Sequence, residues 1–380
     1  MNTLRAPEWL PSFLTPFVTL SYPTQRPAAP DSFPDSPYYG GGLLDGCFII
    51  TCIAVMAILR DSLRLGVFEP FARWWLTRAL RKSKAKLKQN GVANGHAKSN
   101  GGTVEKTNGK INGSANGNGH AAHANECVIS KQEARKLHRS VLRFAEQGWS
   151  SVYYTCQWLY GLYVHRNLPT AVLDPVDVWI NYPHIPLAGP LKFYYLTQSA
   201  FYLHQILILN AEARRKDHWQ MMTHHIITVA LMLGSYFYNY TRVGCLVMML
   251  MDLCDIFLPL AKMFRYLSLS TLCDVTFAGF WLSWLITRHF LFIFVIKSAY
   301  YDAPRIIPRV WDPERGHFMT KGVYVAFNAM LVSLQLLQIM WFSLICRIAY
   351  DVVIGQGADD SRSDSEGNDY SEDEGEKKDR

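Results

Sequence analysis

The sequence predicts an all-α integral membrane protein with about seven transmembrane helices. Of its 380 residues, 49% are apolar and 13% are aromatic, while only 18% are charged. Most apolar residues fall in blocks of roughly 17 to 25, the length that a helix needs to cross a hydrocarbon core about 30 Å thick. A soluble protein of this length would interrupt its apolar segments more often with polar residues.

The net charge of +7 carries information about topology rather than about nucleic acid. The basic residues lie beside apolar blocks and in one linker, without a basic face that carries interleaved aromatic residues. No nucleic-acid partner is therefore expected. The eight cysteines lie mostly inside apolar blocks, with no CxxC pair and no spacing suited to zinc, so buried structural thiols are the favoured interpretation and no metal is expected.

Residues 1–42 are rich in proline and aromatic residues and poor in charge, and they lack the basic start and cleavage site of a signal peptide. We therefore expect an irregular arm there, followed by a first transmembrane helix at 43–60. Basic residues crowd the far side of this helix, which places that side in the cytosol and the amino terminus in the lumen. These basic residues are Arg60, Arg64, Arg73, Arg78, Arg81 and Lys82.

The next segment, 61–130, is predicted to remain on the cytosolic side. Over 68–80, aromatic residues alternate with arginines, which favours an amphipathic helix lying on the membrane surface. From about 83 to 125 the chain consists mainly of Asn, Gly, Lys, Ala and His, with almost nothing to bury. We expect that part to be a disordered linker.

Six further spans follow, and with the first they make seven crossings that place the carboxyl terminus in the cytosol. Lys262 and Arg265 lie on the predicted cytosolic side, whereas Lys297 and Arg305 on the lumenal side run against the positive-inside rule. The spans are expected at about 149–164, 191–209, 221–238, 243–264, 275–296 and 323–345.

Residues 351–380 form an acidic tail, which we expect to be solvated and cytosolic. Serines in the tail are followed three places later by acidic residues, a pattern that suits an acidophilic kinase as well as a simple solubilising tail. The chain ends Lys377-Lys378-Asp379-Arg380. This ending resembles the dilysine retrieval signal of endoplasmic reticulum membrane proteins, so a location in that membrane is expected.

Ionisable residues inside two of the spans are the candidates for chemistry. Each such residue costs about 2.5 to 3.5 kcal/mol in a membrane, so it usually faces the bundle interior and marks function. The fourth span contains the adjacent His224 and His225, and the fifth contains Asp252 and Asp255. The two aspartates share one helix face. The two histidines point about 100° apart and cannot play identical parts.

Estimated depths bring these spans together. At about 1.5 Å per residue, His225 lies about 10 Å and Asp255 about 13 Å inside the cytosolic surface, so Asp255 is the candidate for fixing the histidine tautomer. Arg288 and Asp252 both lie about 13 Å from the lumenal ends of neighbouring spans. Because a lone buried charge is costly, we expect an ion pair between Arg288 and Asp252.

Three interpretations of the cluster remain open from spacing alone. The first is a polar lock between two helices, with His paired to Asp. The second is a metal site, since His and Asp suit a transition metal. However, the sequence lacks the repeated HxxHH boxes that are typical of membrane desaturases and hydroxylases. The third is general-base or nucleophilic catalysis, in which an aspartate orients the imidazole and stabilises the imidazolium.

The run from Glu212 to Lys262 resembles the signature of the longevity-assurance, or ceramide synthase, family within the TLC-domain superfamily. It contains the segments RRKDHWQMM, HHIIT, TRVG, MDLCDI and LAK. The likeness extends from about Lys131 to Tyr350 and includes RFAEQGW, YYLTQSAFYLHQ and WLITRH. The paired histidines followed by DxxD, both within spans, are its most specific part. The long Asn/Gly linker and the lack of a homeobox-like domain resemble fungal members.

The resemblance implies both a fold and a reaction. The fold is a six-helix bundle around a central chamber, formed by a TLC domain at 131–350, with the first helix outside it. The reaction transfers a fatty acyl group from acyl-CoA to the amine of a sphingoid base at the endoplasmic reticulum, with acyl-CoA as co-substrate and no other cofactor. A water-poor chamber suits this reaction because it favours aminolysis of the thioester over hydrolysis.

The resemblance also implies the site residues and partners. His224, His225, Asp252 and Asp255 map onto the essential positions of the family and are the predicted catalytic residues. The predicted substrate-binding residues are Arg288, His289, Asp217 and His218. Membrane lipids and a small single-span regulatory subunit, or a dimer, are further partners. The alternative is a non-enzymatic lipid-sensing or translocation-associated TLC protein in which the cluster is only a helix lock.

Overall fold

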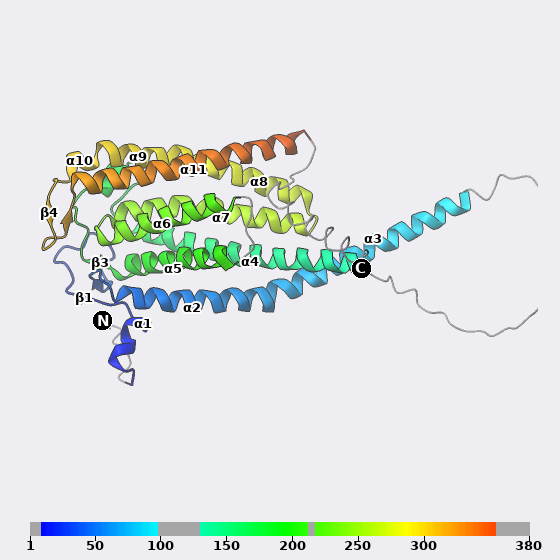
Figure 1. The fold of residues 1–380 in the computed structure, drawn as a ribbon, viewed down its shortest axis with the longest axis horizontal. Coiled ribbons are helices and arrows are strands. Elements are labelled where there is room, and N and C mark those ends of the chain that lie inside the picture. Colours follow the sequence, from blue (N-terminus) through cyan, green and yellow to red (C-terminus); the bar gives the residue numbers. More distant parts are fainter. Residues whose placement is uncertain (1–8, 98–129, 212–216, 355–380) are drawn as a thin grey trace, which may run out of the picture. The chain divides into compact units, whose positions relative to one another are not determined.

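The computed structural model describes residues 9–97, 130–211 and 217–354, with the side chains of 87–97 excepted. Helices make up nearly all of the regular structure in these ranges, and each strand is only two residues long (Figure 1). Four stretches among these residues are long and apolar enough to cross a membrane, at 45–86, 241–266, 270–306 and 321–353. The predicted class of all-α membrane protein is therefore confirmed, while the count of seven crossings stays a prediction.

The chain divides into two compact units, of which the smaller comprises 64–146. Its elements are η2 (Arg64–Phe68), α3 (Glu69–Ala97) and the start of α4 (Lys131–Arg166). The expectation of a disordered linker from about Ser83 is wrong as far as Ala97, because lysine, alanine and leucine in this segment have high helix propensity and extend α3. The rest of the predicted linker, 98–129, lies outside the described residues.

Within the smaller unit, α4 begins with a capping box. The backbone N–H of Glu133 donates to Oγ of Ser130 over 3.2 Å, and the backbone N–H of Ser130 donates to Oε2 of Glu133 over 2.8 Å. Lys84 of α3 donates to the same carboxylate oxygen over 2.6 Å. The Lys84 hydrogen bond and the capping contacts lower the pKa of Glu133 to about 2, so this start signal for α4 persists across the physiological pH range.

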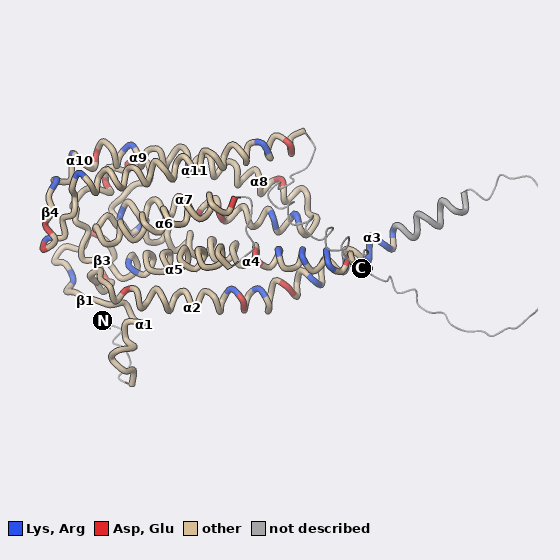
Figure 2. The backbone as a smooth tube through the Cα atoms, viewed as in Figure 1, with Lys and Arg blue, Asp and Glu red and all other residues tan. Residues whose placement is uncertain are grey.

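The larger unit contains a bundle of long helices. They are α2 (Asp45–Leu63), the later part of α4, α5 (Gly189–Ala211), α6 (His218–Phe237), α7 (Thr241–Tyr266), α8 (Ser270–Trp284), α9 (Phe292–Tyr301) and α11 (Lys321–Val353). Figure 2 shows few charged residues along the middle of these helices, and α6 has no Lys, Arg, Asp or Glu. Every predicted span coincides with helix, although the span at 149–164 is only the second half of the 36-residue α4.

The helix predicted at 275–296 changes its hydrogen-bond pattern in the middle. Between α8 and α9 lies a π-helical segment, η4 (Leu285–Leu291). Such segments are rare and occur frequently at functional sites. This one carries Arg288 and His289, and the apolar periodicity of the sequence gives no sign of it.

Short connections set the level of the candidate residues. Three residues join α6 to α7, with Asn239 in the left-handed region at φ 62°, and three more join α7 to α8, with Ser268 at φ 59°. Helices joined this closely run antiparallel. The paired histidines, in the first half of α6, therefore lie level with the middle of α7, which holds Asp252 and Asp255.

The arm predicted at 1–42 has regular structure where it is described. It contains η1 (Ser12–Leu14), α1 (Thr15–Val18), β1 (Pro23–Thr24) and β2 (Tyr38–Tyr39). An antiparallel sheet of order β1-β2-β3 joins it to β3 (Leu187–Ala188), directly before α5. The remaining short elements are η3 (Pro175–Val178), α10 (Ala303–Ile306), β4 (Trp311–Asp312) and β5 (His317–Phe318), of which the last two form a hairpin.

A buried ion pair fastens the arm and α2 to the bundle. Nζ of Lys192 on α5 is fully buried and lies 2.6 Å from Oδ1 of Asp45, the first residue of α2. The same ammonium donates to the carbonyl oxygens of Ser21 and Gly40 over 2.7 and 2.8 Å. Oη of Tyr236 on α6 donates to Oδ2 of Asp45 over 2.7 Å. Two carbonyl acceptors and one hydroxyl donor thus surround the carboxylate and ammonium pair, which satisfies charges that would otherwise be costly to bury.

Candidate functional site

An apolar cavity lies among α6, α7, η4, α9 and α11. It encloses about 980 Å³, including the space at its opening, and its wall consists mostly of aliphatic, methionine and aromatic side chains. Its lining residues on α6 extend from His224 to Ser235, about 16 Å along the helix. A cavity with such an apolar wall suits a lipid chain.

The two faces of α6 separate the paired histidines. His224, Thr228, Leu231 and Ser235 recur at helical spacing and line the cavity. His225 is buried on the next face, as is His218 seven residues earlier, and neither lines the cavity. The prediction that the two histidines occupy different positions therefore agrees with the geometry, and His224 is the one exposed to the cavity.

Aromatic rings hold both imidazoles in place. The ring of His224 lies 5.2 Å from that of Trp341 on α11 and 5.4 Å from that of His225, centroid to centroid. The ring of His225 lies 5.8 Å from that of Tyr202 on α5. Nδ1 of each histidine has no hydrogen-bond partner among the described residues. The imidazoles are thus fixed by packing, with a ring nitrogen left for substrate or water.

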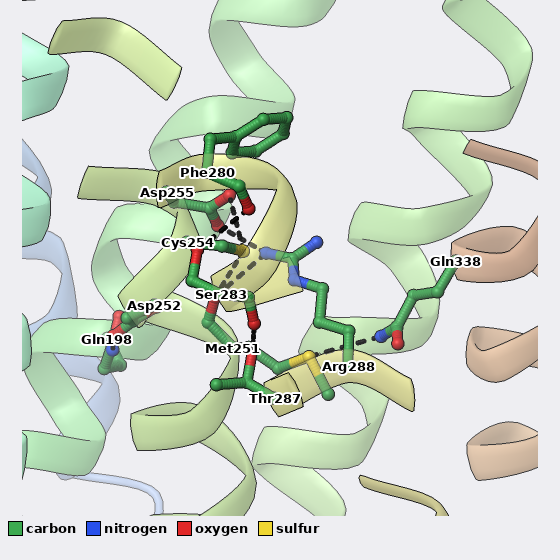
Figure 3. A network of polar contacts seen from close by, with 10 residues as sticks. All are labelled: Gln198, Met251, Asp252, Cys254, Asp255, Phe280, Ser283, Thr287, Arg288 and Gln338. Atoms are coloured by element: carbon green, nitrogen blue, oxygen red, sulfur yellow. Dashed lines mark hydrogen bonds and ion pairs between the residues drawn. The ribbon is translucent and has the colours of Figure 1, made fainter. Parts of the chain in front are cut away.

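The two aspartates contact different neighbours. Oδ2 of Asp252 accepts a hydrogen bond from Nε2 of Gln198 on α5, and Oδ2 of Asp255 lies 2.7 Å from Nη2 of Arg288 (Figure 3). Three residues along an α-helix turn a side chain by about 300°, so the two carboxylates diverge by about 60°. Asp252 therefore faces α5, while Asp255 faces η4.

The predicted ion pair between Arg288 and Asp252 is wrong in its partner. Arg288 pairs with Asp255, and no basic side chain among the described residues lies within ion-pair distance of Asp252. The depth estimate failed because it placed the lumenal end of this helix at residue 296, whereas α9 continues to Tyr301, which puts Arg288 about 20 Å deep, level with Asp255. The predicted contact between Asp255 and His225 is not formed either, since Arg288 holds the Asp255 carboxylate and His225 packs on Tyr202.

Arg288 is the cation of the site. It is buried, lines the cavity, and donates from Nη2 to the carbonyl oxygen of Met251 over 2.9 Å as well as to Asp255. Its guanidinium lies 4.1 Å from the ring centroid of Trp284, a cation–π distance. The π-helical segment thus places the positive charge of Arg288 against Asp255 on α7. Arg288 is therefore the counter-ion of this carboxylate.

The other predicted substrate-binding residues lie away from the cavity wall. His289 faces α11, where its Nδ1 lies 2.8 Å from Nε2 of Gln335 and its ring packs against Phe342 at 4.7 Å. Asp217 and His218 lie at the start of α6, where His218 is buried with its ring 5.5 Å from that of Trp219. The structure therefore brings together Arg288 and the four catalytic candidates, but not these three residues.

Three residues that sequence reasoning did not single out belong to the cluster. Gln198 contacts Asp252, Tyr202 packs on His225 and lines the cavity, and Trp341 packs on His224. Gln198 could have been noticed, because a polar residue in the middle of an apolar block needs a partner. Nothing in the sequence distinguishes Tyr202 or Trp341 from the many other aromatic residues of the spans.

Comparisons with known proteins agree with this geometry. The model of the TLC domain matches residues 143–347, a range that holds every residue of the cluster. Sphingosine N-acyltransferase lag1 of Schizosaccharomyces pombe is 42% identical over 230 residues, which are 60% of this chain and 59% of that protein. Ceramide Synthase FUM18 of Gibberella moniliformis is 37% identical over 254 residues, with the same coverage of 60% and 59%.

A third relative, ceramide synthase hyl-2 of Caenorhabditis elegans, is 34% identical over 225 residues, which are 58% of this chain and 68% of that protein. The matched segment thus spans about three fifths of lag1 and FUM18 and about two thirds of hyl-2. Because the domain model also covers more than half of the chain, the chain belongs to the TLC-domain family.

Proposed function

We propose that the protein is a ceramide synthase that transfers a long-chain acyl group from acyl-CoA to the amine of a sphingoid base. The observation that carries this proposal is the position of His224, which lines an apolar cavity together with Arg288, the ion-pair partner of Asp255. Both proposed substrates have long apolar chains. An apolar cavity can hold one of these chains with its reacting group next to His224. The names of lag1, FUM18 and hyl-2 support the same reaction.

The reaction requires a proton acceptor because the amine of a sphingoid base is protonated near neutral pH. The ammonium loses one proton, the nitrogen attacks the thioester carbonyl, and the C–N bond forms. The nitrogen then loses a second proton as the C–S bond breaks. The leaving thiolate of CoA takes up a proton, so one proton is released overall. Histidine suits this proton transfer because a ring nitrogen of the neutral imidazole can accept a proton and release it again.

We assign the central role to His224, because it lines the cavity and His225 does not. In one route, its imidazole removes the proton from the amine as a general base. In the other, it attacks the thioester first and holds the acyl group until the amine arrives. His225 supports the ring from behind at 5.4 Å. Asp252, which lacks a cationic partner among the described residues, is the carboxylate for the substrate ammonium.

The test is product formation by purified protein with acyl-CoA and a sphingoid base, read by mass spectrometry. Acyl-CoA should be consumed rapidly only when the base is present, with N-acyl product and free CoA in equal amounts. Incubation with acyl-CoA alone separates the two routes, because an acyl adduct on a histidine peptide supports the two-step route. Binding of lipid without turnover under any of these conditions would favour the non-enzymatic alternative.

We also propose the finer topology: seven crossings, a lumenal amino terminus and a cytosolic carboxyl terminus in the endoplasmic reticulum membrane. The basic residues after α2 support the orientation. The terminal Lys377 and Lys378, which lie outside the described residues, would act in retrieval. Changing both to serine should let some molecules reach later compartments, and unchanged localisation would assign retention to the spans or to a partner. A single-span regulatory subunit or a dimer is a further proposal, tested by cross-linking in native membranes.

A further inference from the structure

We propose that Gln198 is a positioning residue for the reaction, whose side-chain amide holds Asp252 in one orientation at the centre of the bundle. The inference deepens the proposed function and rests on it, because Gln198 acts only through Asp252. It concerns a contact between α5 and α7 that neither the paired histidines nor the DxxD spacing reveals.

The hydrogen bonds of Gln198 define which way its amide points. Nε2 donates to Oδ2 of Asp252, and Oε1 accepts from Oη of Tyr153 on α4 over 3.1 Å (Figure 3 shows the first of these). Reversing the amide would place Oε1 against the carboxylate and Nε2 against the hydroxyl hydrogen of Tyr153. Both Gln198 and Asp252 are buried, with exposed fractions of 0% and 1%, so water cannot replace a lost contact.

The surroundings of Asp252 make this amide its main stabilising contact. In the described part of the chain, tyrosines predominate among the titratable groups near the Asp252 carboxyl, and Arg288, the cation that interacts with it, is held by Asp255. These neighbours are Tyr153 and Tyr154 on α4, Tyr194 and Tyr202 on α5, Cys254 and Asp255 on α7 and Arg288 on η4, while His225 on α6 packs against Tyr202. The hydrogen bond that Gln198 donates therefore offsets part of the free-energy cost of burying the Asp252 carboxylate, which has no counter-ion of its own among the described residues.

The orientation matters because it leaves the second oxygen of Asp252 available. Oδ1 is buried and has no hydrogen-bond partner among the described residues. Tyr202, which lines the cavity, lies close enough to interact electrostatically with this carboxyl. With Oδ2 engaged by Gln198, Oδ1 is the acceptor for an ammonium that enters from the cavity side, so Gln198 contributes to the capture of the base rather than of acyl-CoA.

The experiment compares two buried glutamines of the α4–α5 contact in steady-state kinetics. Gln198→Leu should lower kcat/KM for the sphingoid base by about 10- to 100-fold, the loss expected for a hydrogen bond to a charged group, and leave the KM for acyl-CoA unchanged. Gln157→Leu is the matched control. Gln157 is also buried and joins the same helices through a 3.2 Å bond to Oγ1 of Thr197, but it contacts no carboxylate. It should leave both constants near the wild-type values.

A conservative variant adds a readout that a purely structural role would not change. The carboxyl introduced by Gln198→Glu can donate to Asp252 only while it is protonated. The activity of Gln198→Glu relative to wild type should therefore rise as the pH is lowered, whereas the ratio for Gln198→Leu should stay flat. If Gln198→Leu fails to fold, Tyr153→Phe removes the bond to Oε1 without changing shape and should lower kcat/KM for the base in the same direction.

The outcomes separate this inference from the proposed function. Wild-type protein that never joins acyl group and base would overturn the proposed function itself. An active wild type in which Gln198→Leu behaves like Gln157→Leu would overturn only the positioning role. The same follows if Gln198→Leu weakens acyl-CoA and base equally, or if Gln198→Glu and Gln198→Leu share one pH profile.

Discussion

Nη2 of Arg288 lies 2.7 Å from Oδ2 of Asp255, in a bundle where both side chains are largely withdrawn from solvent. The pair joins the π-helical segment η4 to α7, and the carbonyl oxygen of Met251 accepts a second bond from the same nitrogen. Removing one partner of a buried ion pair leaves an uncompensated charge, which costs about 3 to 5 kcal/mol. The pair is therefore a structural requirement of the site as well as a part of its electrostatics.

Arg288→Leu should lower the stability of the purified protein by roughly this amount, about 3 to 5 kcal/mol. Thermal unfolding in detergent and the yield of monodisperse protein are the measurements. Arg288→Leu combined with Asp255→Asn should recover part of the loss, because neither charge then remains unpaired. Arg288→Leu combined with Asp252→Asn is the control and should recover little. Equal recovery in the two double variants would contradict the assignment of Asp255 as the partner.

Lys192→Met should destabilise the protein where the arm and α2 are attached to α5. The variant leaves Asp45 buried with no cation and removes two bonds to backbone carbonyls of the arm, so we expect a loss of about 3 to 5 kcal/mol. Limited proteolysis within the arm should become faster, because its tether is gone. Lys321→Met is the control, since Lys321 is an exposed lysine at the start of α11. Proteolysis of the Lys192 variant at the control rate would show that the sheet alone holds the arm.

Hydropathy and motif spacing predicted the helices and the four catalytic candidates, because membrane helices need long apolar runs and buried ionisable residues are few. The ion-pair partner could not be predicted in the same way. The helix that carries Arg288 continues to Tyr301 rather than ending at 296, so Arg288 lies level with Asp255 and not with Asp252, and the spacing of apolar residues does not mark this end. Gln198 is a third case. The sequence shows that a polar residue in an apolar block needs a hydrogen-bond partner, but only the packing of α5 against α7 shows that this partner is Asp252.

Gly244→Ala should destabilise the contact between α5 and α7. A Cβ at this position would lie 1.8 Å from Oη of Tyr195, which bonds Oγ of Ser235 and the carbonyl oxygen of Thr241. Forcing this hydroxyl away should cost about 1 to 3 kcal/mol. Gly46→Ala is the matched control, because a Cβ there meets nothing within 4 Å, and should be neutral or stabilising by up to about 1 kcal/mol. Tyr195→Phe should relieve part of the Gly244→Ala loss.

Acid should destabilise the loop before β3 through His184. Burial and the nearby Arg242 cation lower the pKa of His184 from 6.5 to about 4. The unfolded chain therefore binds a proton at a higher pH than the folded one, so this contribution to stability is complete above pH 6.5 and is lost as the pH falls toward 4, to the extent of about 3 kcal/mol. His184→Gln should flatten the decline of Tm over this window. An identical decline in variant and wild type would assign the acid sensitivity to other groups.

His224→Ala and His225→Ala should both lose nearly all activity while the proteins remain inserted and monodisperse. For His224 the reason is chemical, because its ring is the one exposed to the cavity and proton transfer by a positioned side chain contributes typically about 10²- to 10⁴-fold. For His225 the reason is support, because its ring packs against both His224 and Tyr202. His225→Phe keeps a ring in that position and should recover part of the activity, whereas His224→Phe should recover none. If activity recovers in both phenylalanine variants, the two histidines act only by packing between helices, and the proposed proton transfer by an imidazole is wrong.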